Sequence, residues 1–166
     1  MIMRYEFALK GRKRNAKPYH FKNSGLPNVY LFNGVTIEQD EEYGELVTIA
    51  SLPDLFVAIA FKLVTKPDRL TGAEMRFLRK RMEMAQADLA KELWVSEQTV
   101  ANYEKGKTEG GPADTALRFL FLAHVADDED LAQELRLEAE DLMRPSRRDR
   151  MKPTGAGPWC VTNTWN

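Results

Sequence analysis

The segment from residue 70 to residue 125 constrains the fold most strongly, because its apolar residues recur at helical spacing between helix start and stop signals. Thr71-Gly72-Ala73-Glu74 is a capping-box sequence, and Met75, Leu78 and Met82 follow it on one helical face. The sequence therefore predicts that this segment opens with an amphipathic helix.

Three further helices are predicted at short intervals. Gln86 to Leu93 has one apolar side, Ser96 is a good cap for the next helix, and Gly106 stands where that helix should end. Pro112 can open a last helix in its first turn, and the apolar stripe of that helix extends to about Val125. We expect an all-α domain here.

The two middle helices have the spacing of a helix-turn-helix. Ala90 is the small residue that a steep helix crossing requires, and four apolar residues should hold the crossing: Leu89, Leu93, Val95 and Val100. The opposite face of the second helix then carries polar side chains: Glu97, Gln98, Thr99 and Asn102. Such side chains can bond base edges in the major groove of double-stranded DNA, so we predict that these four read bases.

This stretch resembles the lambda-repressor-like, Xre/Cro-type helix-turn-helix family. The motifs that carry the resemblance are Leu78-Arg79, Gln86-Ala87-x-Leu89-Ala90 and Val95-Ser96-x-Gln98-Thr99-Val100-x-x-Tyr103-Glu104-Lys105-Gly106-Lys107. The resemblance implies a DNA-binding regulator whose phosphate contacts come from Arg79, Gln86, Ser96, Tyr103, Lys105 and Lys107. Trp94 departs from the family, which usually has glycine at this place in the turn. We therefore expect that the turn does not rely on the left-handed conformation of a glycine, and that the Trp94 indole either packs or protrudes.

The sequence upstream predicts a small β-meander and one helix. Asn28 to Phe32 is strand-like, Asn33-Gly34 is a strong hairpin signal, and Val35 to Ile37 suits the returning strand. Glu45 to Ile49 is a third candidate strand, and Asp54 to Val64 has helical spacing. The chain as a whole is thus predicted to be α+β.

The arrangement of this β unit before the helices is similar to the MqsA-type antitoxin group, through Tyr19-His20-Phe21, Gly25-Leu26-x-Asn28-Val29-Tyr30-Leu31 and the segment 70–79. In that group a zinc-binding cysteine pair precedes the helix-turn-helix. Here Asn23-Ser24-Gly25 stands where one pair would be expected. The similarity implies regulation of its own operon and, as an alternative function, sequestration of a toxin protein by the N-terminal domain or tail.

Charge is segregated along the chain, although the formal net charge is only -1. The first 22 residues contain seven basic residues against one acidic residue: Arg4, Lys10, Arg12, Lys13, Arg14, Lys17 and Lys22 against Glu6. Residues 70–125 hold eight charges of each sign. Because phosphate contacts supply most non-specific affinity, we predict that Arg12, Lys13 and Arg14 form a basic arm that binds DNA phosphates.

Five regions follow: a basic N-terminal arm (1–22), a β-rich domain (23–66), a helix-turn-helix domain (67–126), an acidic helix (127–143) and a basic flexible tail (144–166). One reading helix covers few bases, so we expect a homodimer on a palindromic operator. Its seam could contain Phe119, Leu131, Leu135 and Leu142. Trp159 and Cys160 belong either to a loose terminus or to a short segment that docks on a partner or back onto the body.

Other classes of function find little support. The sequence has no glycine-rich phosphate loop, no nucleophile elbow and no paired histidine ligands, so we expect neither an enzyme nor a cofactor. Cys160 with His20 and His124 is a poor metal-ligand set, so no metal is predicted. We expect no membrane association, because the longest apolar run, residues 55–61, is too short to span a bilayer. A cytoplasmic location is expected.

Overall fold

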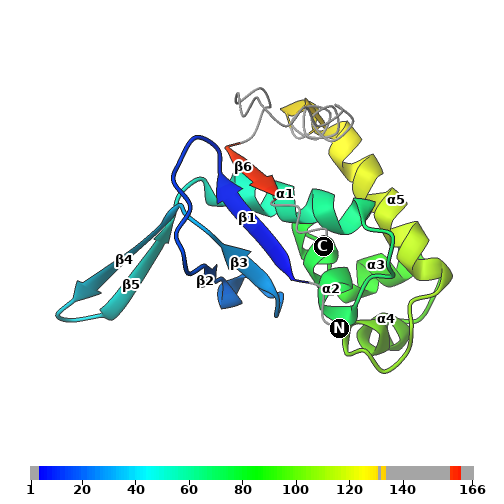
Figure 1. The fold of residues 1–166 in the computed structure, drawn as a ribbon. Helices are drawn as coiled ribbons and strands as arrows, with labels where there is room; N and C mark the ends of the chain where they lie inside the picture. Colours follow the sequence, from blue (N-terminus) through cyan, green and yellow to red (C-terminus); the bar gives the residue numbers. More distant parts are fainter. Residues whose placement is uncertain (1–3, 131, 134–157, 162–166) are drawn as a thin grey trace. The chain divides into compact units, whose positions relative to one another are not determined.

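The computed structural model describes residues 4–130, 132–133 and 158–161. It is α+β, as predicted, with a small N-terminal sheet region and five α-helices (Figure 1). The chain forms two compact units, which divide within helix α1 (Leu52–Thr65) after Ile59. Each unit contains its own buried apolar residues.

The first unit contains a four-stranded sheet in the order β2-β3-β1-β6. Strand β1 (Tyr5–Leu9) lies between β3 (Val29–Leu31), to which it is parallel, and β6 (Trp159–Val161), to which it is antiparallel (Figure 1). The short strand β2 (Tyr19–His20) completes the other edge beside β3. The sheet therefore joins segments from both ends of the sequence.

Strand β1 lies within the basic N-terminal arm predicted for residues 1–22, where the sequence indicates at most a strand-like stretch from Tyr5 to Leu9. All five of its residues are buried, from Tyr5 to Leu9. Tyr5, Phe7 and Leu9 alternate with Glu6 and Ala8, as in a strand with one buried face, so the sequence does not reveal that both faces of β1 are covered. The basic residues that follow β1 belong to the loop between β1 and β2, and residues 11–17 of this loop are exposed.

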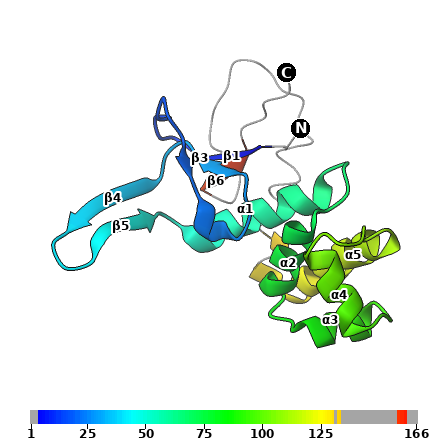
Figure 2. The same cartoon turned by 90° about the horizontal axis from the view of Figure 1, so that it is seen from below.

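The prediction of a hairpin at Asn33-Gly34 is wrong, although the strands predicted on both sides of it are confirmed. Strand β4 (Val35–Asp40) does not pair with β3; it pairs with β5 (Gly44–Ile49) in a separate two-stranded ribbon that extends away from the sheet (Figures 1 and 2). Asn33 is buried, and its side chain bonds the backbone of Leu9, accepting from the amide at 2.5 Å and donating to the carbonyl at 3.2 Å. Its side chain thus ties the end of β3 to β1, so the three strands form no meander.

Trp159 fixes the last strand to the body of the first unit. Its side chain is 1% exposed, and its indole N–H donates to the carbonyls of Ala50 and Ser51 at 3.1 and 3.2 Å. Gly34 has a φ of +72°, and a Cβ at this position would lie 2.8 Å from the Trp159 ring. Of the alternatives for this segment, the structure supports docking back onto the body.

The second unit gathers helices α2 (Gly72–Arg81), α3 (Gln86–Glu92), α4 (Glu97–Glu104) and α5 (Pro112–Asp127) (Figure 2). The predicted capping box is present, since Thr71 accepts from the Glu74 amide and Glu74 accepts from the Thr71 amide. Pro112 opens α5, as predicted. The core contains the apolar faces of these helices: Met75, Leu78, Leu89, Val100, Leu117 and Phe121.

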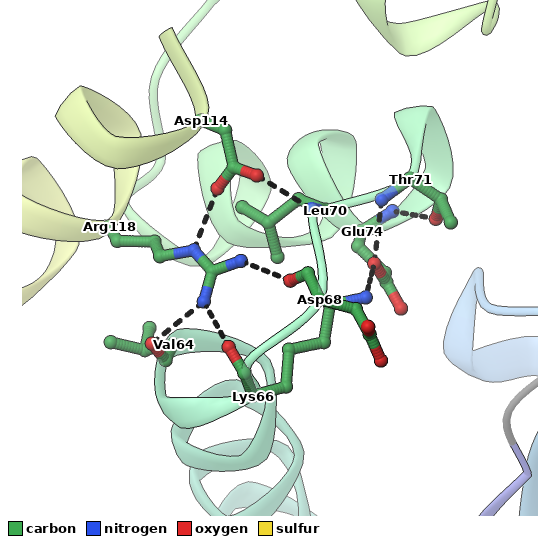
Figure 3. A network of polar contacts seen from close by, with 8 residues as sticks. All are labelled: Val64, Lys66, Asp68, Leu70, Thr71, Glu74, Asp114 and Arg118. Atoms are coloured by element: carbon green, nitrogen blue, oxygen red, sulfur yellow. Dashed lines mark hydrogen bonds and ion pairs between the residues drawn. The ribbon is translucent and has the colours of Figure 1, made fainter. Parts of the chain in front are cut away.

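Arg118 of α5 holds the connection between α1 and α2. Its guanidinium donates to the carbonyls of Val64, Lys66 and Asp68, and its Nε donates to Asp114 at 2.7 Å (Figure 3). The same Asp114 accepts from the Leu70 amide at 2.8 Å. This network positions the start of α2, against which α4 packs.

Of the acidic helix predicted over residues 127–143, the structure describes residues 127–130 and 132–133, and residues 129, 130, 132 and 133 are helical. The remainder of that segment and most of the tail lie outside the described residues. Helix α5 itself ends at Asp127.

Candidate nucleic-acid interface

Helices α3 and α4 are joined by the tight turn from Leu93 to Ser96. The Val95 amide donates to the Ala90 carbonyl at 3.0 Å, and the Trp94 amide donates to the Lys91 carbonyl at 3.2 Å. Trp94 has a φ of +56°. The expectation that the turn does not rely on the left-handed conformation of a glycine is therefore wrong: these bonds hold the turn, and Trp94 occupies the conformation that glycine adopts most easily.

Ser96 caps the N-terminus of α4, as predicted. Its hydroxyl accepts from the Thr99 amide at 3.1 Å, and the Ser96 and Thr99 hydroxyls lie 2.8 Å apart. The cap is local, so it follows from the sequence without any tertiary information. It orients the first turn of α4, where three of the four predicted base-reading residues lie.

The predicted base-reading residues lie together on the outer side of α4. Glu97 and Gln98 are exposed, while Thr99 and Asn102 are partly exposed. The Gln98 amide donates to the Asn102 side chain at 3.1 Å, as residues four apart on one helical face can. Val100 is 1% exposed and holds the inner side of the helix. The helix thus presents amide, hydroxyl and carboxylate groups to the outside.

Arg79 and Gln86, two predicted phosphate ligands, converge on Glu104. Arg79 donates to both oxygens of this carboxylate, at 2.5 and 3.0 Å, and Gln86 donates to it at 2.9 Å. Arg76 adds a contact at 3.2 Å, and the remaining Arg79 nitrogen, Nη1, donates to the Met84 carbonyl. The Arg79 guanidinium thus links α2 to α4, and phosphate binding by this group stays a prediction.

Sequence reasoning assigned no role to Glu104, although its side chain is only 1% exposed. Burial alone would raise the pKa of Glu104, but the hydrogen bonds from Arg79 and Gln86, the charge of Arg79 and the Arg76 contact hold the pKa below its ordinary value. A buried anion with three donor side chains orients α4 against its neighbours. The available signal was an acidic residue on the same helical face as the buried Val100, four residues later.

Ser96, the predicted phosphate ligand that caps α4, is exposed, and three more predicted phosphate ligands lie at or just beyond the C-terminal end of α4: Tyr103, Lys105 and Lys107. Lys105 and Lys107 are exposed and Tyr103 is partly exposed. Gly106 follows the helix with a φ of +70°, as expected for a residue that stops a helix, and the Lys107 amide then donates to the Asn102 carbonyl at 2.9 Å.

Arg12, Lys13 and Arg14 are exposed in the β1–β2 loop of the first unit. The Asn33 side chain donates to the carbonyls of Arg12 and Lys13 at 3.2 and 3.4 Å, and the Asn15 amide donates to Phe32 at 2.7 Å. The loop is therefore anchored at its backbone while its cationic side chains extend into solvent.

Residues 75–110 match the family model described as helix-turn-helix. The match supports the Xre-type resemblance for this segment and indicates a DNA-binding transcriptional regulator. No curated protein matches the chain, and no solved structure matches it.

Two further observations concern only the part of the chain that the structure describes. It contains no group of three or more histidine, cysteine, aspartate or glutamate residues arranged to hold a metal ion. None of its helices combines the length and the apolar character that crossing a membrane requires.

Proposed function

We propose that this protein is a sequence-specific transcriptional repressor that binds a palindromic operator near its own gene as a homodimer. The observation that carries the proposal is the outer face of α4, where Gln98 and Asn102 lie side by side beyond a capped N-terminus. Gln and Asn can form paired hydrogen bonds with adenine in the major groove. In this proposal α4 reads the bases.

A double substitution tests the reading helix. Gln98→Ala with Asn102→Ala should remove the preference for the DNA upstream of the gene over random DNA, at a cost of about 1–3 kcal/mol for each base that is no longer read. The matched control is Gln39→Ala with Asn23→Ala, which removes the same two exposed residue types from the first unit. Titration of labelled duplexes measures both affinities. Specific binding that survives the first pair of changes would show that α4 does not read the operator.

The basic loop is proposed to supply phosphate contacts, because residues 70–125 have no excess of positive charge. Changing Arg12, Lys13 and Arg14 to alanine should weaken binding to every sequence. The slope of log affinity against log salt should become shallower by about 0.9 for each phosphate that the loop no longer neutralises. Loss of operator preference alone would contradict this assignment.

Dimerisation is proposed because a symmetric operator requires two reading helices. On α5, Phe119 is 67% exposed and Leu122, one turn later, is 42% exposed, which favours the predicted seam. The other predicted seam residues, Leu131, Leu135 and Leu142, lie outside the described residues. Phe119→Asp should shift a dimer toward monomer in sedimentation experiments, whereas His124→Asp, at an exposed position that faces away from Phe119 on the same helix, should do so less.

A second candidate function is antitoxin-like binding of a protein through the first unit, and the β4–β5 ribbon favours it. The ribbon has two strands only, exposes Ile37 and Val47 on one face, and carries acidic residues without any basic one: Glu38, Asp40, Glu41, Glu42 and Glu45. Such a hairpin is marginally stable by itself, and its charge suits a basic protein. Replacing residues 36–48 by a short turn should abolish co-purification of a toxin encoded by a neighbouring gene while DNA binding is retained.

A further inference from the structure

Trp94 is an unusually placed tryptophan. Its side chain is 94% exposed, and its backbone has a φ of +56°. A left-handed conformation is costly for a residue with a Cβ, and an indole in water is costly as well. Trp159, by contrast, is 1% exposed and bonds two carbonyls through its ring nitrogen. The fold therefore uses one tryptophan for packing and leaves another, at a strained position, entirely outside.

The place of Trp94 in the helix-turn-helix indicates what the indole meets. It lies two residues before Ser96, the cap of α4, and three before Glu97, the first residue of that helix. The N-terminal end of a reading helix is the end that approaches the bases, so the turn before it borders the strand that flanks the groove. Leu93 and Val95 are only partly exposed, so within the turn Trp94 is the apolar side chain free to extend outward.

We propose that the Trp94 indole packs against the sugar–phosphate backbone at the edge of the groove that α4 enters. This inference rests on the proposed DNA binding and adds a non-ionic contact to it. The apolar face of deoxyribose gives the ring a surface that every sequence presents. Such a contact also suits a helix-turn-helix segment with eight charges of each sign, because it does not depend on a basic excess.

The test compares two substitutions to glycine in the full-length chain. Trp94→Gly relieves the left-handed strain and removes the indole. Ser51→Gly relieves the same kind of strain, at a φ of +50°, on an exposed and uncharged residue of the first unit. Neither change alters the net charge, and neither should lower the melting temperature. A difference in DNA affinity between the two variants therefore measures the contribution of the Trp94 indole to DNA binding.

The probe is a short duplex of mixed sequence, since the contact is independent of sequence. Trp94→Gly should weaken binding about tenfold, to the mixed duplex and to the upstream DNA alike, with the salt slope unchanged because no counterion is released. Ser51→Gly should bind like the wild type. Equal affinities of Trp94→Gly, Ser51→Gly and the wild type would overturn the inference and leave DNA binding intact. A shallower salt slope would overturn it too, because it would indicate an ionic effect.

Fluorescence gives an independent readout. In the free protein the exposed Trp94 ring should be quenched by acrylamide, and the mixed duplex should protect it. Trp94→Phe should lose the quenchable component that DNA protects. Unchanged quenching of wild-type fluorescence at saturating duplex would overturn the inference. A wild-type chain that binds neither duplex would instead remove the proposed function on which the inference depends.

Discussion

The two units of this protein differ in how far apart in the sequence their stabilising contacts lie. In the helical unit, Glu104 receives Arg76 and Arg79 from 28 and 25 residues away, and the caps are bonds between residues three apart. In the sheet unit, the Cys160 thiol donates to the carbonyl of Ala8 across 152 residues. The sheet of the first unit thus depends on pairing between distant segments, which sequence periodicity does not reveal. The helices of the second unit follow from local periodicity and capping, although Arg118 and Asp114 also join distant segments there.

The largest effect is expected at Glu104, because this residue joins α4 to α2 within the helical unit. Glu104→Ala should lower the free energy of unfolding by about 3–5 kcal/mol, because it leaves the Arg79 guanidinium buried without its partner. Urea denaturation followed by circular dichroism measures the change. Glu109→Ala is the matched control, since that carboxylate forms an exposed ion pair with Arg69 and should cost about 0–1 kcal/mol. Similar losses from both variants would refute the role of Glu104.

A substitution at Trp159 tests whether strand β6 contributes to the core of the sheet unit. Trp159→Ala should cost about 3 kcal/mol, because it empties a buried site and leaves the Ala50 and Ser51 carbonyls without the indole N–H. The matched control is Trp94→Ala, which truncates the same residue type at an exposed position. Chemical denaturation compares the two. If the two substitutions cost the same, residues 159–161 do not contribute to the core.

Gly34 and Gly44, both in the first unit, differ in how much space surrounds them. Both have positive φ, at +72° and +76°, but a Cβ on Gly34 would lie 2.6 Å from Leu9, whereas one on Gly44 would meet nothing within 4 Å. Gly44→Ala should therefore cost only the left-handed strain, about 1 kcal/mol, and Gly34→Ala about 1–3 kcal/mol more. Denaturation midpoints measure the difference. Equal costs of the two substitutions would mean that Gly34, which follows β3, does not pack closely against Leu9 of β1.

The smallest expected effect concerns pH. Because the pKa of Glu104 is lower in the folded protein than its ordinary value of 4.5, this residue stabilises the fold above that pH. The contribution is lost as the pH falls below about 4.5 and through the folded pKa. Glu104→Gln should flatten the acid limb of the stability curve, measured as the free energy of unfolding from about pH 6 to about pH 3. An unchanged acid limb would contradict the assignment.

Much of the candidate interface could be predicted from the sequence, because helix caps, helical spacing and the turn depend on residues a few positions apart. Ser96, Val100 and Gly106 take the predicted places, and residues 97–99 with Asn102 share the outer face of α4. The conformation of Trp94 was predicted wrongly, because residue type alone does not reveal that neighbouring hydrogen bonds can impose a left-handed turn. Whether these residues bind DNA as assigned stays a prediction.

The sequence by itself determined the α+β class, the helices of the second unit and the polar face of α4, since these follow from local periodicity and capping. Only the tertiary structure decided that Tyr5–Leu9 is a central strand, that Asn33 bonds Leu9 instead of forming a hairpin, and that Trp159 returns to the sheet. It also decided that Arg79 and Gln86 meet at Glu104. The physical reason is that burial and hydrogen bonding between distant segments choose among the conformations that local sequence permits.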